Sequence, residues 1–328
     1  MNAQEPTGPG ANPTVVLDPV VVRFVADGSE GATRHDGPPD PASGREALER
    51  LQGHAVPRPP ADERWIAVPV AGGREVPVRV VRPPDTTGAL PVVLFLHGGG
   101  WVFGSARTHD RLVRELATRS RAAVVVPEYS RAPEARYPVA LEESLDVVRW
   151  IRRTGAAHGL DGERLAVAGD SAGGNLAAAL TLLLGGEPGP RPRALALFYP
   201  VTDAASTTPS YAAFADGPRL TASAMRWFWD QYADERDRSL PTVAPLHAGA
   251  DALARSPRTL VITAEADPLR DEGEAFAAAL RAADVPVTAV RYAGTIHDVM
   301  MLDALRDTPA ARAATDQAGT FLRSALRD

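Results

Sequence analysis

A serine flanked by glycines stands where a strand pattern gives way to a helix pattern. Residues 165–168 form a short apolar run, residues 169–173 have the sequence GDSAG, and residues 176–184 are rich in helix formers. A sharp turn between a strand and a helix needs small flanking residues, and it exposes the hydroxyl of Ser171 at a helix N-terminus, where negative charge is favoured. The pattern predicts a nucleophilic serine, although a glycine-rich turn of a nucleotide-binding fold, capped by the same serine, would look similar.

Three successive glycines follow an earlier apolar run. Residues 92–96 are apolar and lead into His97 and the glycines. Glycines let a substrate approach the backbone, so the N–H groups of Gly98 and Gly99, joined by that of Ala172, are expected to stabilise the oxyanion of an acyl-transfer intermediate. A phosphate-binding loop is disfavoured, because a phenylalanine interrupts the GxGxxG spacing and the chain has no lysine for a Walker motif.

The partners of such a serine are expected at the ends of later strands. His297 follows the last apolar run, at the edge of the sheet where ligands bind in open α/β folds, and it is the predicted general base. Asp267 follows the preceding strand pattern, and the proline after it disfavours helix there, so this carboxylate is predicted to orient the histidine. Glu265 is the alternative acid if the strand ends earlier. Asp271 and Glu272 enter a helix and are expected to be structural.

Eight short apolar runs predict the sheet that must position these groups. They lie at residues 65–70, 76–82, 92–97, 123–127, 165–168, 194–199, 259–264 and 287–292. The sequence AGGR between the first two is a hairpin signal, and helix-like stretches separate the others, as in a buried parallel sheet. We therefore expect an α/β fold with a mostly parallel, eight-stranded sheet, flanking helices and one antiparallel edge.

Two segments stand apart from this alternating pattern. The N-terminal region contains a polar stretch at 1–13, expected to be disordered, and predicted helices at 17–26 and 42–52. A second region between two strands is too long for an ordinary loop. The predicted organisation is an N-terminal segment, a first part of the catalytic domain, an insertion and a second part of the catalytic domain, at residues 1–60, 61–201, 202–248 and 249–328.

The composition excludes several kinds of protein. With 45% hydrophobic and 23% charged residues the chain is typical of a globular protein, and its net charge of -6 disfavours binding to nucleic acid or anionic membranes. The absence of cysteine excludes disulfides, thiolate metal sites and a cysteine nucleophile. No closely spaced histidine pair occurs, so neither a metal nor a cofactor is expected. Without a signal peptide or a long apolar run, a cytoplasmic location is expected.

Taken together, these motifs make the chain resemble the hormone-sensitive-lipase-like esterases, the bacterial family IV of the α/β-hydrolase superfamily. The resemblance spans the chain from residue 17 onward and rests on HGGGW at 97–101, EYSRAPE at 128–134, GDSAGG at 169–174, DPLRDEG at 267–273 and HD at 297–298. It implies that the N-terminal helices and the insertion form a cap over the site. It also implies hydrolysis of short-chain acyl esters through an acyl-enzyme intermediate.

Aromatic residues of the insertion and of the glycine loop are expected to enclose an apolar substrate pocket. Each buried acyl methylene would contribute about 0.8 kcal/mol until the chain meets the pocket wall, so we expect acyl groups of about two to six carbons to be preferred. Helical spacing within the insertion also allows some of these aromatics to serve only as packing. The candidates are Trp101, Phe103, Tyr211, Phe214, Trp227, Phe228 and Trp229.

Other functions remain open at this stage. An amide or carbamate hydrolase would use the same nucleophile and the same oxyanion donors. A non-catalytic ligand-binding protein on this scaffold, of the gibberellin-receptor kind, would lack the histidine that is present here at His297. Residues 285–292 form the last strand, whose edge carries little charge, and both this feature and the family resemblance predict a homodimer through that edge.

Overall fold

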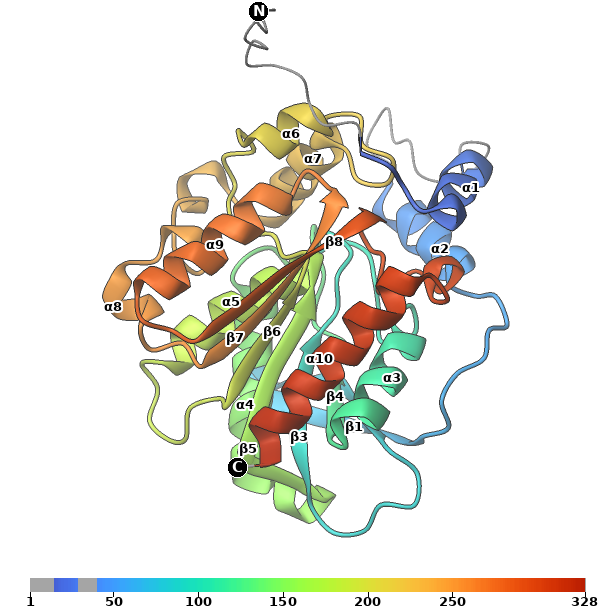
Figure 1. Cartoon of the computed structure of the whole chain (residues 1–328). Coiled ribbons are helices and arrows are strands. Elements are labelled where there is room, and N and C mark those ends of the chain that lie inside the picture. The colour runs from blue at the N-terminus through green and yellow to red at the C-terminus, as the bar shows by residue number, and fades with distance from the viewer. Residues whose placement is uncertain (1–14, 29–39, 328) are drawn as a thin grey trace, which may run out of the picture.

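The computed structural model describes residues 15–28 and 40–327, and Figure 1 shows how their helices and strands are arranged. The expected disorder of residues 1–13 concerns a segment outside this range. A single sheet with the strand order β1-β2-β4-β3-β5-β6-β7-β8 forms the centre. Its strands are β1 (Asp62–Val70), β2 (Arg74–Arg82), β3 (Leu90–Leu96), β4 (Ala123–Pro127), β5 (Leu160–Asp170), β6 (Ala194–Phe198), β7 (Arg258–Ala266) and β8 (Val287–Ile296).

The sheet has the predicted mixture of strand directions. β1 and β2 pair antiparallel across a short 3-10 turn, and β2 also pairs antiparallel with β4, whereas β4, β3, β5, β6, β7 and β8 run parallel. All eight predicted strands are present. β5 begins five residues before the apolar run at 165, because Leu160 and Asp161 pair with β3 ahead of an irregularity in the register. The predicted α/β fold with one antiparallel edge is confirmed.

Long helices cover both faces of this sheet. Right-handed crossovers place α4 (Val139–Thr154), α5 (Ser171–Leu184) and α9 (Arg270–Ala282) on one face, since each connects strands in the same direction across the sheet. α3 (Asp110–Ser120) connects strands in the opposite direction and packs with α10 (Pro309–Arg327) on the other face (Figure 1). The inner strands β4 and β6 are therefore buried along their whole length.

Shorter helices gather beyond the carboxyl ends of the parallel strands. Figure 1 shows α6 (Pro209–Ala213) and α7 (Ala222–Tyr232) above the sheet, with α1 (Pro19–Gly28) and α2 (Pro41–Leu51) beside them. The two N-terminal helices match the predicted ones to within two residues. α2 begins where the Asp40 side chain accepts the backbone N–H of Ser43, and α7 begins where Thr221 accepts that of Ala224. The N-terminal helices and the insertion, which are far apart in the sequence, thus lie at the same end of the molecule.

One edge of the sheet differs from the centre. β8 has only β7 as a neighbour, and most of its residues before Thr295 are exposed or half-buried. The antiparallel hairpin of β1 and β2 closes the opposite edge. In residues 15–28 and 40–327, no helix combines the length and the apolar character needed to cross a lipid bilayer.

Candidate active site

The serine of the GDSAG motif lies at a tight turn between β5 and α5. Ser171 is the first residue of α5 and has a φ of +51°, a region that side chains rarely adopt. The turn is possible because Gly173 approaches the backbone of β3 so closely that a Cβ there would overlap the carbonyl oxygen of Leu96. The sequence therefore forces a strained backbone that holds the serine side chain at the carboxyl end of the central strand.

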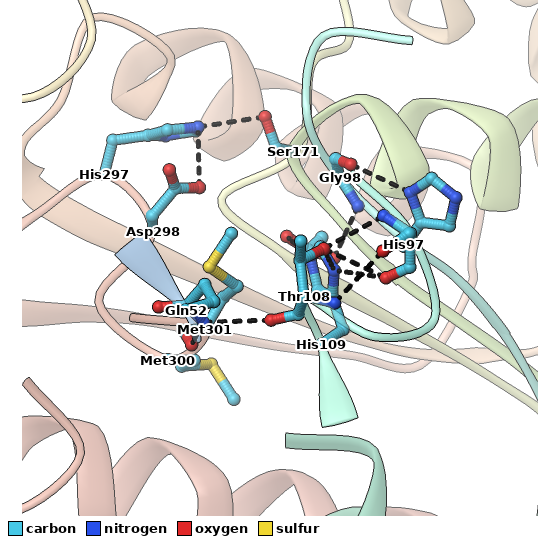
Figure 2. A network of polar contacts seen from close by, with 12 residues as sticks. Gln52, His97, Gly98, Thr108, His109, Ser171, His297, Asp298, Met300 and Met301 are labelled. Carbon is cyan, nitrogen blue, oxygen red and sulfur yellow. Dashed lines mark hydrogen bonds and ion pairs between the residues drawn. The ribbon is translucent and has the colours of Figure 1, made fainter. Parts of the chain in front are cut away.

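Three strand ends bring the predicted triad together. The Ser171 Oγ lies 2.9 Å from Nε2 of His297, which follows β8, and Figure 2 shows these two side chains pointing at each other. Nδ1 of the histidine lies 2.7 Å from Oδ2 of Asp267, which follows β7. The other carboxylate oxygen accepts the backbone N–H of Leu269 at 2.9 Å. All three side chains are buried, so water competes little for their hydrogen bonds.

A second carboxylate adjoins the histidine. Oδ1 of Asp298 lies 3.4 Å from Nε2 of His297, and its Oδ2 accepts the Arg219 Nε–H at 3.1 Å. Burial lowers the pKa of His297, but the two aspartates together offset this effect and raise the pKa above its ordinary value of 6.5. Burial raises the pKa of Asp298, and the neighbouring histidine and arginine outweigh burial, so the pKa is lowered. The base is thus held between two acids, one of which is paired with a cation.

Three other acids lie near these residues: Glu265, the alternative acid, and Asp271 and Glu272, which were expected to be structural. Glu265 accepts the backbone N–H of Gly294 at 2.7 Å, and no hydrogen bond to His297 is found for it among the described residues. Asp271 and Glu272 accept backbone N–H groups at the start of the insertion, from residues 210 and 202 at 2.7 and 2.6 Å. These two acids attach the insertion to α9.

In the glycine loop, the N–H group of Gly98 does not have its predicted role. The N–H of Gly98 donates to Oδ1 of the buried Asp170 at 2.9 Å, so this donor is already used within the protein. Gly99 and Gly100 line the cavity next to Ser171 instead, and both have a positive φ, of +112° and +62°. The prediction of Gly98 as an oxyanion donor was wrong because spacing alone could not show which glycine faces the side chain of the GDSAG aspartate.

Ala172, the third predicted oxyanion donor, directly follows Ser171 in α5. It is in the first turn of α5, where no intrahelical carbonyl can accept its N–H, and it is fully buried next to Ser171. Its N–H is therefore available to a ligand atom above the helix N-terminus.

A buried polar network supports the glycine loop from behind (Figure 2). Oδ2 of Asp170 lies 3.3 Å from Nε2 of His109, whose Nδ1 lies 2.9 Å from the hydroxyl of Thr108. Gln52, at the end of α2, donates to the carbonyl oxygens of Thr108 and Met301 at 2.9 and 2.8 Å. One buried amide thus joins the N-terminal segment to the glycine loop and to the loop after the triad histidine.

The cavity over Ser171 is small, with a volume of about 80 Å³. A long acyl chain would have to displace side chains of its wall. The wall includes Phe103 of the glycine loop together with Leu220, Met225 and Phe228 of the insertion. The rings of Phe103 and Phe228 meet edge to face at 5.3 Å.

Only two of the seven predicted aromatics line this cavity. Trp101 is buried and stacks on Tyr232 of α7 at 4.2 Å, with Trp229 against it at 4.6 Å, so this pair of tryptophans joins the glycine loop to the insertion. Trp227 packs behind Phe103 and Phe228, at 5.8 and 5.2 Å. Tyr211 is a buried residue of α6 within the insertion, and Phe214 lies under the guanidinium of Arg270 at 5.4 Å. These five contribute packing outside the cavity, where Trp101, Tyr211 and Trp229 are buried and Phe214 and Trp227 are partly buried.

Arg219 and Asp298 are the charged residues of the site for which the sequence predicted no role. The arginine lies in an irregular stretch without a recognisable pattern, and its contact with Asp298 joins segments 79 residues apart. A faint signal existed for the aspartate, since it directly follows the predicted base. Its φ of +66° turns the side chain back toward that base, which no local pattern predicts.

Comparison with known proteins agrees with this geometry. The family model described as alpha/beta hydrolase fold matches residues 93–301, a range that contains the glycine loop, the serine turn, Asp267 and His297. The chain belongs to the α/β-hydrolase family. The family resemblance drawn from the HGGGW and GDSAGG motifs is thereby confirmed.

Relatives of this α/β hydrolase include several named esterases. An ethyl acetate hydrolase of Pseudomonas putida is 40% identical over 237 residues, which are 71% of this chain and 74% of the relative. A carboxylesterase of Mycobacterium tuberculosis is 38% identical over 257 residues, 78% of this chain and 80% of that protein. The crystal structure of a thermostable esterase from Pseudomonas putida ECU1011 superposes with a TM-score of 0.88 at 41% identity, covering 97% of this chain and 99% of that one.

Proposed function

We propose that this α/β hydrolase is a serine carboxylesterase that cleaves short-chain acyl esters. The observation that carries the proposal is the hydrogen-bonded chain from Ser171 through His297 to Asp267, open to a small apolar cavity. The esterases among its relatives, similar over most of their length, support the same reaction class. The chain is accordingly assigned as a carboxylic ester hydrolase.

The first half of the reaction forms an acyl-enzyme. The Oγ of Ser171 attacks the ester carbonyl while Nε2 of His297 takes its proton, and Asp267 stabilises the imidazolium through Nδ1. The carbonyl oxygen becomes an oxyanion near the N–H groups of Gly99, Gly100 and Ala172. The imidazolium then gives the proton to the alkoxy oxygen, the bond between carbonyl carbon and alkoxy oxygen breaks, and the alcohol leaves.

The second half restores the enzyme. A water molecule attacks the acyl carbon while His297 takes its proton, and the oxyanion again forms at the same three N–H groups. The bond to Oγ breaks, the proton passes from Nε2 to Ser171, and the carboxylic acid departs. No group outside the chain and water is needed for the atoms and charges to balance.

The helices beyond the sheet serve as the cap in this proposal. The insertion at 202–248 bounds the substrate cavity, helices α1 and α2 of the N-terminal segment lie beside the insertion, and the two parts of the catalytic domain at 61–201 and 249–328 carry the reacting groups. The edge strand β8 is the proposed surface for a homodimer, because in the described part of the chain β7 is its only strand neighbour in the sheet and its one charged side chain, Arg291, is paired with Glu274. Sedimentation tests this pairing, which is contradicted by a mass near 34.7 kDa at micromolar concentration.

Hydrolysis of p-nitrophenyl esters of increasing acyl length tests the proposed function. We expect the highest kcat/KM for acyl groups of about two to six carbons, because longer groups must displace packed side chains at a cost of about 1 to 3 kcal/mol. The Ser171→Ala variant is the matched control for background hydrolysis. Equal rates for four-carbon and sixteen-carbon esters would contradict a closed cavity, and equal rates for both proteins would contradict the serine mechanism.

A further inference from the structure

A second, larger cavity lies beside the catalytic one. Its volume is about 540 Å³, and it is bounded by α1, by the chain that follows α2, and by the segment 303–306. Apolar side chains form much of its wall, from Val20 and Phe24 of α1 and from Leu51 and Val56. The reaction proposed above does not use this space.

Among the described residues, Arg219 is the one that lines both cavities. It lines the small cavity over Ser171 and also the larger one. Its side chain is 10% exposed, and only its Nε–H is bonded, to Asp298. Within the described parts of the chain, its two Nη groups have no hydrogen-bond acceptor and are not sealed from solvent. Two N–H groups on each Nη are therefore free to bind a ligand.

Arginines and carboxylates both line the larger cavity. Arg23, Arg219 and Arg306 face two carboxylates, Asp27 and Asp303. The buried Asp303 is already paired from behind by two further arginines, at 2.7 and 3.8 Å. Arg219 and Arg306 are paired with Asp298 and Asp307, at 3.1 and 3.2 Å, so the feature that an anion would meet here is the pair of free Nη groups of Arg219. A guanidinium with free Nη groups presents the planar fork that matches a carboxylate.

We propose that the larger cavity binds the carboxylate end of an ester substrate whose apolar spacer joins that carboxylate to the scissile ester. The proposal rests on the proposed esterase function and names its substrate class. Arg219 binds the carboxylate, while Val20, Phe24 and Leu51 pack against the spacer. Monoesters of aliphatic dicarboxylic acids place the anion on the acyl half, and acyl esters of hydroxy acids place it on the alcohol half.

The experiment compares charged esters with neutral isosteres. Monoethyl adipate is paired with ethyl adipamate, and 6-acetoxyhexanoate with 6-acetoxyhexanamide, so that each pair differs only in a terminal carboxylate or carboxamide. We expect kcat/KM to be about 10- to 100-fold higher for the charged member of one pair, the range that hydrogen bonds to a charged group support. The pair that responds identifies the half of the ester that enters the cavity.

Three variants separate this binding from the chemistry. Arg219→Gln is expected to bring the ratio of charged to neutral ester close to one. Arg306→Gln, which lies away from the small cavity, should lower the ratio while kcat/KM for ethyl acetate stays unchanged. Ala304→Phe, at an exposed position on the rim, should slow both six-carbon esters and spare ethyl acetate.

The outcomes distinguish the two proposals. If ethyl acetate and the other neutral esters are hydrolysed but both ratios are near one, or if Arg219→Gln leaves a high ratio intact, the carboxylate site is wrong and the esterase function stands. If no ester is hydrolysed, the proposed function fails. Calorimetric titration of Ser171→Ala with monoethyl adipate, 6-acetoxyhexanoate and their amides then still measures binding to the carboxylate site. Equal affinity for the charged and the neutral member of both pairs contradicts the proposed site.

Discussion

The glycine-loop side and the cap side of the active site are built by different means. On the first side, Gly99, Ser171 and His297 follow directly from strand ends, and buried hydrogen bonds set their positions. On the cap side, Arg219 and Phe228 reach the cavity from an insertion held by aromatic stacking and by two acids of α9. The difference suggests that substitutions on the first side change the rate of chemistry, whereas those on the cap side change which ester is accepted.

The largest effect is expected at the triad. His297→Ala removes the base, and Asp267→Asn removes the acceptor that holds the imidazole in its reactive tautomer, so each should lower kcat by about 10⁴-fold or more. The double variant should be little worse than either single one, because the residues act as a unit. Steady-state kinetics on p-nitrophenyl acetate measures all three, and near-normal turnover in His297→Ala would show that the triad is wrongly assigned.

A smaller effect is expected behind the glycine loop. Asp170→Asn weakens the hold on the Gly98 N–H and on His109, so the neighbouring oxyanion donors should be less well placed. We expect kcat to fall about tenfold with little change in KM, since the loss of a hydrogen bond to a charged group costs about 1.5 to 3 kcal/mol.

Asp271→Asn provides the matched control for that variant, because this aspartate anchors the insertion through the N–H of Ser210. It should affect substrate range or melting temperature, and kcat for a small ester should stay close to that of the wild type. A loss of kcat in Asp271→Asn alone, or an unchanged kcat in Asp170→Asn, would contradict the view that the glycine-loop side controls the rate and the cap side the choice of ester.

The acyl preference should respond to the cavity wall. Phe228→Ala opens space next to Phe103 and should move the optimum toward longer acyl groups, with kcat/KM for the longer esters rising several-fold. Trp229→Ala is the control, since this buried ring packs on Trp101 away from the cavity and its loss should lower stability by about 3 to 5 kcal/mol without moving the optimum. If the preferred acyl length shifts in Trp229→Ala and not in Phe228→Ala, Trp229 is the wall residue and Phe228 the packing residue.

The smallest effect is a shift in the pH profile. His297 must be neutral to act as the base, so kcat/KM should rise with pH through its pKa, which lies above 6.5. Asp298→Asn removes a charge that raises this pKa and should move the rise to lower pH. Arg219→Gln removes a charge that lowers it and should move the rise to higher pH. Asp267 faces the imidazole unchanged in both variants, so shifts in the same direction would contradict this electrostatic arrangement.

Local sequence was a sufficient guide to the sheet and to the three neighbouring side chains proposed as the triad, for a physical reason. Buried parallel strands require continuous apolar runs, and a serine at a strained turn requires small neighbours such as Gly173, so both leave local patterns. Spacing could not distinguish Gly98 from Gly100 as an oxyanion donor, because the choice depends on where the Asp170 side chain points.

The cavity wall was less accessible to sequence reasoning. Trp101 and Phe103 are both aromatic residues of the glycine loop, yet the first stacks into the insertion and the second faces the cavity. The packing of α7 against the glycine loop determines which of these two rings faces the cavity. The helix lies more than a hundred residues further along the chain. The contact of Arg219 with Asp298 is likewise tertiary and leaves no periodic signal.

Labelling of the nucleophile tests the central claim most directly. The purified protein is treated with an organophosphate, digested, and mapped by mass spectrometry while residual esterase activity is followed. We expect one phosphoryl group per chain, on Ser171, formed in step with the loss of activity and absent from His297→Ala treated in the same way. A label on any other serine, or full activity in a chain labelled at Ser171, would contradict the mechanism.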